Sequence, residues 1–273
     1  MREIKKSFCY SALLLLLVLF ASCSSEKTKV YKKTPVDEFI TKYLDEPNFS
    51  VILADMDYKE EDKSYYHKYR VLIEKPQVKV DASTLNDSTK VADDVKVIDT
   101  EWRKVSDIFF DSNINNLGMT IVSKKNGVVD KETSPAGYDN YVGNERYGSW
   151  RTNSSGGSFW AFYGQYHFMS SLFYGSSHRY YRSDYRNYDT NYRGKTGYYG
   201  SGTNKYGTTS TTNTKSSWNS KPNTFKSKVR NSVSKSATAS RSKSYNSSSK
   251  TQRNSSRYSN SSSSRSRSGG FGK

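Results

Sequence analysis

The sequence is poor in cysteine and proline, and the shortage of cysteine limits how the protein is held together. Among 273 residues there are 2 cysteines, Cys9 and Cys23, and 5 prolines. Cys9 lies inside an N-terminal segment that we expect to be removed, so a mature chain beginning at Cys23 has one thiol. We therefore expect a fold without an intramolecular disulfide.

Acidic and aliphatic residues become rare toward the C-terminus. Residues 24–150 carry 19 basic and 23 acidic residues, whereas residues 151–273 carry 21 basic residues and only 2 acidic ones, Asp184 and Asp189. No Leu or Ile follows Leu172, and Val229 and Val233 are the valines beyond it. Such a segment buries too little apolar surface to offset its chain entropy. We therefore predict that residues 175–273 are a disordered basic tail, rich in Ser, Asn and Tyr, that has an anionic partner.

Motifs for catalysis and metal binding are scarce as well. His67, His167 and His178 lie far apart in the sequence, and none has another histidine four residues away, as a helical metal site requires. There is no GxSxG motif, no phosphate-binding glycine loop and no nucleophilic cysteine. We therefore predict no catalytic residue, no metal site and no cofactor, and a protein that is not an enzyme. His67 is expected to pack in a strand or lie at the surface.

The chain has one unbroken apolar run, residues 12–21, which follows Arg2, Lys5 and Lys6. This run is too short for a membrane-spanning helix, which needs about 20 apolar residues. A basic start, a short apolar core and small residues at its end are typical of a secretory signal peptide. We therefore assign residues 1–22 to a signal peptide.

The end of that segment, Leu19-Phe20-Ala21-Ser22-Cys23, resembles a bacterial lipobox, with Phe20 in place of the usual Leu. The resemblance implies that Cys23 is acylated and becomes the mature N-terminus, which also removes a lone exposed thiol. Stable anchoring takes more than one lipid chain, and a diacylated or triacylated cysteine supplies it. Residues 23–33 are then a polar, lipidated tether, and the expected location is the cell envelope, lipid-anchored in the outer membrane.

Residues 34–133 are expected to form a small α+β domain, mostly antiparallel. Thr34 as cap, Pro35 in the first turn and the apolar spacing that follows predict a helix that ends at Pro47. A second helix is indicated by the helical spacing of Trp102, Val105, Ile108 and Phe109, with Thr100 as its cap. Strands are expected over residues 50–56, 65–73, 78–80 and 95–97, followed by a hairpin of residues 119–122 and 128–129 with an Asn126-Gly127 turn.

Two acidic stretches of this domain have the residues of a cation site. Residues 55–62 contain Asp55, Asp57, Glu60, Glu61 and Asp62, which either bind a hard cation through oxygen or form a solvated turn between two strands. We favour the turn. Residues 111–118 begin like a calcium loop, but Asn116 and Val122 occupy the places of the required glycine and glutamate. We therefore read that stretch as a loop ending in a glycine turn.

Residues 134–174 form an aromatic, Gly- and Tyr-rich segment. Its aromatic density, highest from Phe159 to Phe173, leaves two alternatives open. The segment either docks on the preceding domain and completes its core, or it presents an exposed aromatic patch to a membrane interface or a partner.

Two short motifs resemble those of a group of uncharacterised bacterial envelope lipoproteins, which pair a GSFW segment with a basic tail that carries a GGFG element. The matching residues are 157–160 and 269–272. The resemblance covers a small part of the chain, and it implies an envelope lipoprotein without implying a reaction.

The C-terminal cations are the predicted binding residues. Tyr181, Tyr185, Tyr188 and Tyr192 have helix-like spacing with arginines between them, which is typical either of a stacking and charged surface or of a soluble coil without a fixed partner. The residues expected to bind polyanions are Arg179, Arg182, Arg186, Arg193, Arg241, Lys243, Arg253, Arg257, Arg265 and Arg267.

Together these features predict a non-enzymatic cell-envelope lipoprotein whose partners are the membrane, through the lipid on Cys23, and anionic envelope polymers or lipids. A secreted protein that binds extracellular DNA is the first alternative, because cations on an extended chain bind any polyanion. Intracellular nucleic acid is not an expected partner of a secreted chain. The second alternative is an envelope enzyme with an unrecognised site in residues 34–133.

Overall fold

The computed structural model describes residues 33–75, 94–154, 156–175, 178–202, 204–210 and 216–246. The predicted signal peptide, Cys23, the expected strand at 78–80 and the GGFG element lie outside the described residues. The elements from Thr34 onward belong to one unit of the chain.

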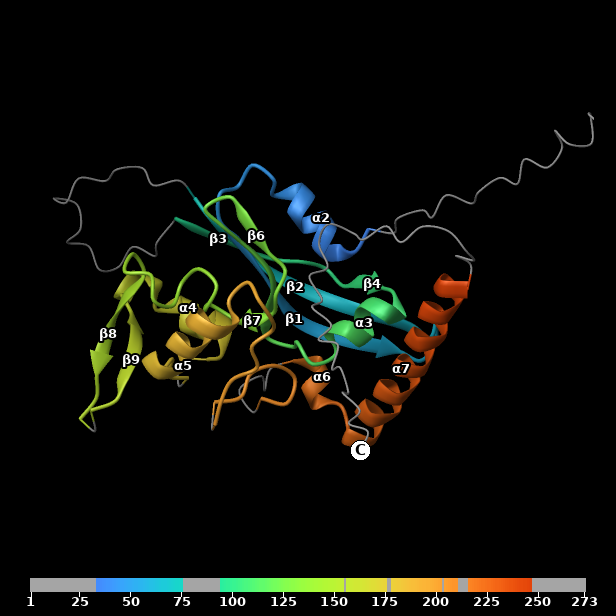
Figure 1. The fold of residues 1–273 in the computed structure, drawn as a ribbon. Coiled ribbons are helices and arrows are strands. Elements are labelled where there is room, and N and C mark those ends of the chain that lie inside the picture. The colour runs from blue at the N-terminus through green and yellow to red at the C-terminus, as the bar shows by residue number, and fades with distance from the viewer. Residues whose placement is uncertain are drawn as a thin grey trace, which may run out of the picture. The chain divides into compact units, whose positions relative to one another are not determined.

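A seven-stranded antiparallel sheet forms the centre of the fold (Figure 1). Its main path runs β3-β2-β1-β5-β6, while β4 also pairs with β2 and β7 with β5. The prediction of a mostly antiparallel α+β domain is therefore confirmed. The strands are β1 (Phe49–Lys59), β2 (Ser64–Glu74), β3 (Val95–Asp99), β4 (Arg103–Val105), β5 (Met119–Lys125), β6 (Val128–Asp130) and β7 (Ser134–Pro135).

Local signals set the first helix and the hairpin as expected. Helix α2 (Pro35–Lys42) begins at a capping box, in which the Thr34 side chain accepts from the Asp37 amide and the Asp37 carboxylate accepts from the Thr34 amide. The turn between β5 and β6 has Asn126 at φ 49° and Gly127 at φ 82°, the left-handed conformations that a two-residue hairpin turn requires. Helix α2 ends at Lys42, with Tyr43 as its C-cap, ahead of Pro47.

The second predicted helix is displaced along the chain. Val105 lies in β4 and pairs with Tyr65, and helix α3 (Asp107–Asn113) begins only afterwards, capped by Ser106. Thr100 does not cap a helix, because its hydroxyl and its amide both bond to the backbone of Tyr69 in β2. Pairing with β2 therefore decides the conformation of residues 103–105, against their helical spacing.

The aromatic segment completes the core, as the first of its two alternatives predicted. It contains the hairpin β8 (Gly148–Thr152) and β9 (Ser158–Phe162), a 3-10 turn (Gly164–Tyr166) and helix α4 (Phe168–Phe173). The central sheet is covered on both faces, since Val51 and Leu53 of β1 pack with α2, whereas Ile52 packs with the aromatic segment. The buried aromatic residues of this segment are Tyr138, Tyr141, Tyr147, Trp160, Tyr166, Phe173 and Tyr174.

Ordered structure continues well past residue 175, so the predicted start of the disordered tail is too early. Helix α5 (Arg182–Asn187) leads into a π-helical turn (Tyr188–Tyr192), and helices α6 (Ser217–Ser220) and α7 (Asn223–Asn246) follow. Tyrosine replaces Leu and Ile as the buried residue here, because its ring supplies apolar surface and its hydroxyl can be hydrogen-bonded, as those of Tyr198 and Tyr206 are to Asp184. The buried side chains include Tyr180, Tyr188, Tyr198, Tyr206, Trp218, Val229, Val233 and Ala237.

Helices α6 and α7 lie against the end of the sheet where α3 sits (Figure 1). Trp218, Val229 and Val233 form a third core cluster together with Met56 and Phe110. No helix among the described residues is long and apolar enough to cross a membrane.

Candidate functional site

The predicted polyanion-binding residues fall into groups with different surroundings. The side chains of Arg179, Arg182, Arg186, Arg193 and Arg241 are described. Lys243 lies in α7, but its side chain is outside the described part, as are Arg253, Arg257, Arg265 and Arg267. These last residues stay predictions.

The Arg193 guanidinium binds other residues of the same chain. Its guanidinium donates to the backbone carbonyls of Asp139, at 2.8 Å, and Tyr138, at 2.9 Å, and to the Tyr185 hydroxyl, at 3.2 Å. It also pairs with Asp189 at 2.6 Å. Arg193 therefore fastens the turn after α5 to the aromatic segment, and its donors are already used.

Arg241 also has an internal partner, because its Nη2 lies 3.1 Å from the Asp111 carboxylate. Arg179, Arg182 and Arg186 are different, as is Arg151, which the sequence did not single out. All four are exposed, and none has an ion pair or a guanidinium hydrogen bond to a described residue. We call the surface that Arg151 and Arg179 form with their aromatic neighbours on the β8–β9 hairpin the arginine face. It consists of Arg151, Arg179, Phe159 and Tyr181.

Strand pairing places this surface on the outer side of the β8–β9 hairpin. Arg151 of β8 is the cross-strand partner of Phe159 in β9, and Phe159 in turn bridges to Tyr181. The Trp160 amide donates to the Tyr180 carbonyl at 2.8 Å, so residues 180–181 add a short third strand. Because side chains alternate along a strand, Arg151, Phe159 and Tyr181 share one side while Trp160 and Tyr180 face the core.

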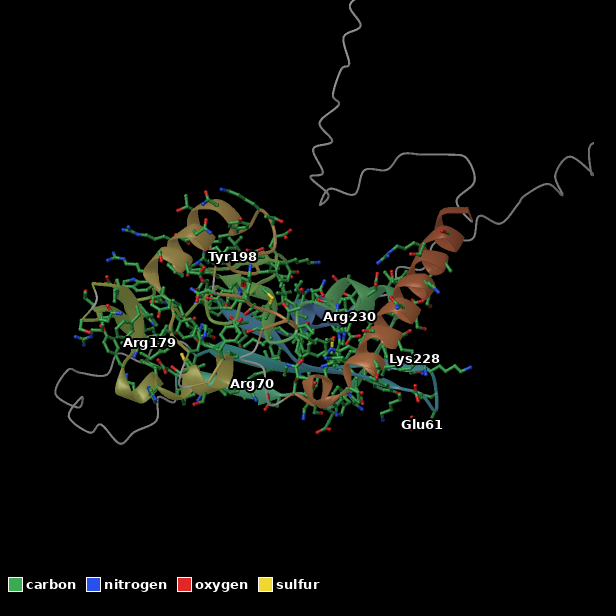
Figure 2. All side chains as sticks on the ribbon, turned by 90° about the horizontal axis from the view of Figure 1, so that it is seen from below. Glu61, Arg70, Arg179, Tyr198, Lys228 and Arg230 are labelled. Atoms are coloured by element: carbon green, nitrogen blue, oxygen red, sulfur yellow. The ribbon has the colours of Figure 1, made fainter. Side chains whose placement is uncertain are left out.

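Two of the arginines lie over aromatic rings. The guanidinium carbon of Arg179 is 4.9 Å from the centre of the Phe159 ring, and that of Arg182 is 5.7 Å from the Trp150 ring. Cation–π contact of this kind limits the motion of the guanidinium while its N–H groups stay free for a ligand. Trp150 pairs with Trp160, so Arg182 lies on the opposite side of the hairpin from Arg151, and Arg186 is four residues beyond Arg182 on the same side of α5. Figure 2 shows Arg179 in this region, away from Lys228 on α7.

The acidic stretch ends in a solvated turn between β1 and β2, as we favoured, because residues 59–63 are exposed, while the carboxylates nearer β1 contact the C-terminal part of the chain. Asp55 accepts from the backbone amides of Ser217 and Trp218 at the start of α6, and Lys221 lies 3.3 Å from Asp57. Further along the turn, Lys228 lies 3.0 Å from Glu60. Lys221 and Lys228 therefore pair with two of the acidic residues of this stretch.

A cavity of about 470 Å³ lies beside this turn, and both its acidic and its basic wall residues are partly paired. No group of three or more His, Cys, Asp or Glu side chains in the described part is arranged to hold a metal ion. The residues that line the cavity are Asp57, Tyr58, Lys59, Glu60, Glu61, Lys221 and Phe225.

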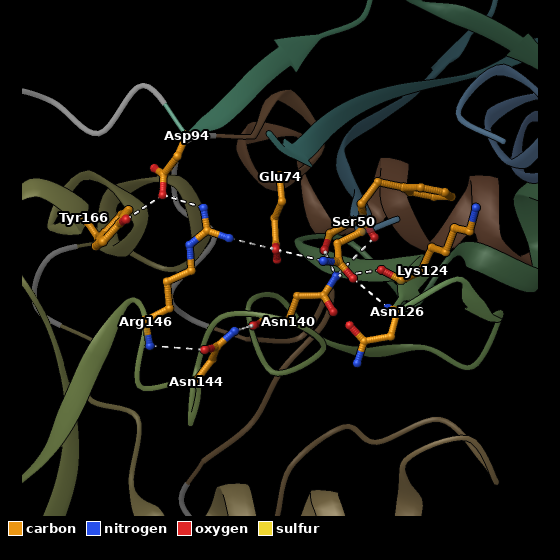
Figure 3. Close-up of polar contacts among 11 residues, drawn as sticks. Ser50, Glu74, Asp94, Lys124, Asn126, Asn140, Asn144, Arg146 and Tyr166 are labelled. Atoms are coloured by element: carbon orange, nitrogen blue, oxygen red, sulfur yellow. Dashed lines mark hydrogen bonds and ion pairs between the residues drawn. The ribbon is translucent and has the colours of Figure 1, made fainter. Parts of the chain in front are cut away.

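A buried polar cluster joins the sheet to the aromatic segment (Figure 3). Arg146 donates to Asp94 at 2.7 Å and lies 3.6 Å from Glu74, while the Tyr166 hydroxyl also donates to Asp94, at 2.6 Å. Asn140 binds three oxygens of β1 and β5, at 3.1–3.3 Å. Burial raises the pKa of the Glu74 carboxyl, since its charge is poorly solvated there.

Among the described residues of the domain, Ser50 and Asp139 come closest to the arrangement of a nucleophile beside a general base. The Ser50 hydroxyl donates to the Asp139 carboxylate, which also accepts from Thr120 at 3.1 Å. Burial raises the pKa of Asp139. Ser50 and Asp139 are 1% and 2% exposed, so a substrate does not reach them in this structure. The pair fits a structural role, anchoring the aromatic segment to β1.

A buried carboxylate with tyrosine donors was not found from the sequence. Asp184, 4% exposed, accepts from the hydroxyls of Tyr138, Tyr198 and Tyr206. The signal was present, since Asp184 is one of two acidic residues in the C-terminal half and stands among tyrosines. The Asp184 carboxylate binds tyrosine hydroxyls inside the fold, so its charge does not neutralise the arginine face.

The described histidines are separate from one another in the fold. His67 is fully buried and stacks on Phe110, with ring centres 5.2 Å apart, and burial lowers its pKa to about 3. His178 packs on Tyr180 and Tyr206, and burial lowers its pKa to about 4. Burial of this kind disfavours the charged imidazolium. The prediction that His67 packs in a strand is confirmed.

Comparison with protein-family models, with curated proteins and with solved structures found no match. The arginine face is therefore interpreted from its own chemistry.

Proposed function

We propose that this chain is a non-enzymatic lipoprotein of the bacterial cell envelope, anchored in the outer membrane by lipid on Cys23, whose folded part binds anionic envelope polymers or lipids. The observation that carries the binding part is that Arg151, Arg179, Arg182 and Arg186 are all exposed and have no carboxylate partner in the described part of the chain. Exposed cations that are not paired with carboxylates attract anions and raise their local concentration.

The anchoring part is supported by the sequence alone. A basic start, an apolar run and the Ala21-Ser22-Cys23 ending are the features that favour it. Labelling cells with a fatty-acid analogue tests this part directly. We expect Cys23→Ala to lose the label and Cys9→Ala to keep mature, labelled protein. Equal labelling of wild type and Cys23→Ala would contradict lipid attachment at Cys23.

The binding part is tested on the full chain with a matched pair of triple variants. One carries Arg151→Gln, Arg179→Gln and Arg182→Gln. The control carries Lys104→Gln, Lys131→Gln and Lys228→Gln, which removes the same charge from exposed lysines that pair with carboxylates. Affinity for lipopolysaccharide, anionic liposomes and DNA is measured against salt concentration.

We expect the arginine variant to lose affinity at low salt and the lysine variant to lose little. For DNA, each lost phosphate contact lowers the log–log salt slope by about 0.7 to 0.9. Equal losses in the two variants would mean that only net charge matters, and the exposed arginines would not be the site. Binding to DNA alone would favour the secreted DNA-binding alternative.

A further inference from the structure

Three side-chain oxygens from distant parts of the chain meet inside the core. The Tyr138 hydroxyl lies 2.8 Å from Oδ2 of Asp184, and the Tyr206 hydroxyl lies 2.6 Å from the same atom. The two hydroxyl oxygens are 2.9 Å apart. All three side chains are at most 4% exposed. We call these three atoms the oxygen triangle.

The spacing of the oxygen triangle matches the ligand sphere of a small, hard cation. An octahedral ion that binds oxygen at about 2.0 Å has neighbouring ligand atoms about 2.8 Å apart. The three sides of the triangle are 2.6, 2.8 and 2.9 Å. Hydrogen bonds between oxygens have similar lengths, so the charge and the surroundings of the triangle must decide between a proton and a metal ion.

The charge of the oxygen triangle favours a trivalent ion. Two phenolates and one carboxylate carry three negative charges, which a ferric ion cancels, whereas a divalent ion leaves an uncompensated charge in the core. Burial raises the pKa of the Tyr138 and Tyr206 hydroxyls, so both keep their protons in the metal-free chain. A bound cation reverses this preference, because it is then the largest charge near the two oxygens.

The surroundings of the oxygen triangle supply support, an entry route and a further donor. The Tyr198 hydroxyl donates to Oδ1 of Asp184, and the Ser201 hydroxyl lies 3.3 Å from that oxygen, so both orient the carboxylate from outside the triangle. Ser201 is exposed, which places solvent next to the carboxylate. His178 packs on Tyr206, and its buried Nε2 has no hydrogen-bond partner among the described residues. An imidazole nitrogen is a suitable iron ligand.

We propose that Tyr138, Tyr206 and Asp184 form a binding site for ferric iron. Each ion releases two phenolic protons to solvent and binds the two phenolate oxygens and Oδ2 of the carboxylate. The spacing of histidines and carboxylates in the sequence does not predict such a site, because two of its three ligands are tyrosines. The site is separate from the exposed arginines, so it goes beyond the proposed function, and either can fail without the other.

The experiment uses the full chain with Cys9→Ser and Cys23→Ser, so that no thiol binds or reduces the metal. Ferric nitrilotriacetate supplies the iron, because it keeps the ion soluble, and zinc chloride is the divalent comparison. We expect one ferric ion per chain and a new visible absorption band, since a phenolate donates charge to ferric iron. An excess of zinc should not displace the ion or remove the band.

Tyrosine variants of that chain test whether the oxygen triangle is the site. Tyr138→Phe combined with Tyr206→Phe should lose both the band and the bound ion, and Asp184→Asn should weaken binding by about a hundredfold or more. Tyr188→Phe is the matched control, because Tyr188 is buried beside Tyr138 and has no hydrogen bond to Asp184. It should keep the band and the ion.

The urea unfolding midpoint shows which variants are folded. If the double variant does not fold, Tyr138→Phe and Tyr206→Phe are used singly, and each should weaken the band. The inference is overturned if the folded parent binds no ferric iron or binds it without the band. It is also overturned if Tyr188→Phe loses as much of the band as the triangle variants, or if folded triangle variants keep it.

Discussion

Arg193 and Arg186 lie close together in the sequence, but their guanidinium groups have different surroundings. Arg193 donates to two backbone carbonyls and a tyrosine hydroxyl, whereas Arg186 is exposed. We expect Arg193→Met to lower the free energy of unfolding by roughly 3 kcal/mol, since it leaves buried carbonyls unpaired. Arg186→Met is the matched control and should change it little. Chemical denaturation measures both, and similar values for the two would contradict the role given to Arg193.

His67 makes stability depend on pH. Its folded pKa of about 3 is below the ordinary value of 6.5, so below pH 6.5 the unfolded chain binds a proton that the folded chain does not. Stability is therefore lost as pH falls, by about 1.4 kcal/mol per pH unit for one such group. Between pH 6.5 and 4 this amounts to roughly 3 kcal/mol.

We expect His67→Gln to reduce the slope of unfolding free energy against pH in that window, leaving the part due to His178, whose pKa is about 4. His167→Gln, which removes an exposed histidine, should keep the full slope. The slope is read from urea denaturation at a series of pH values, so a general loss of stability in the variant does not hide it. An unchanged slope in His67→Gln would contradict the assignment.

At the scale of the element, helix α7 depends on a narrow apolar stripe. Val229, Val233 and Ala237 recur every four residues and are buried against α3 and the sheet. Polar contacts flank the stripe, since Ser236 and Ser240 both donate to Asp107 at the start of α3. Serine and asparagine give this helix little intrinsic propensity, so its packing must supply much of its stability.

We expect Val233→Asp to release α7, because a carboxylate at this fully buried site has no partner. The loss of docking free energy should be about 3 kcal/mol or more. Ser234→Asp, at the exposed neighbouring position, is the control. Limited proteolysis should cut Val233→Asp within residues 223–246 faster than wild type, and the control at the wild-type rate. Equal rates for the two variants would mean that α7 does not depend on the stripe.

The elements that the sequence predicted well are those with strong local signals. The alternation in β2, the Asn126-Gly127 turn and the cap at Thr34 each depend on a few neighbouring residues. Helix α7 was missed because its apolar stripe is only three small residues among serines and lysines, and its partners lie about a hundred residues earlier. The same holds for the arginine face, where the pairing of Arg151 with Phe159 and then Tyr181 brings distant residues together.

At the scale of the whole molecule, the uneven distribution of charge has a use inside the fold. Residues 24–150 are slightly acidic and residues 151–273 strongly basic, and composition alone favoured an outside partner for the basic half. Part of the positive charge pairs with the chain's own acidic residues: Lys221 with Asp57, Lys228 with Glu60 and Arg241 with Asp111. Composition counts charges without saying which are paired, so the candidate site was predicted in kind but not in place.

Two truncations separate the internal use of the basic half from its external use. Removal of residues 247–273 takes away six cations outside the described part, whereas removal of residues 211–273 also takes away α6 and α7. We expect the shorter truncation to keep the unfolding midpoint in urea. The longer one should lower it, because it uncovers Met56, Phe110 and Leu117, which are fully buried in the intact chain. Salt should have a modest effect on the unfolding midpoint of the intact chain, since the ion pairs of Lys221, Lys228 and Arg241 are partly exposed and screened. If the longer truncation unfolds at the same urea concentration as the intact chain, helices α6 and α7 are not part of the folded core. Their cations would then be available to an outside partner.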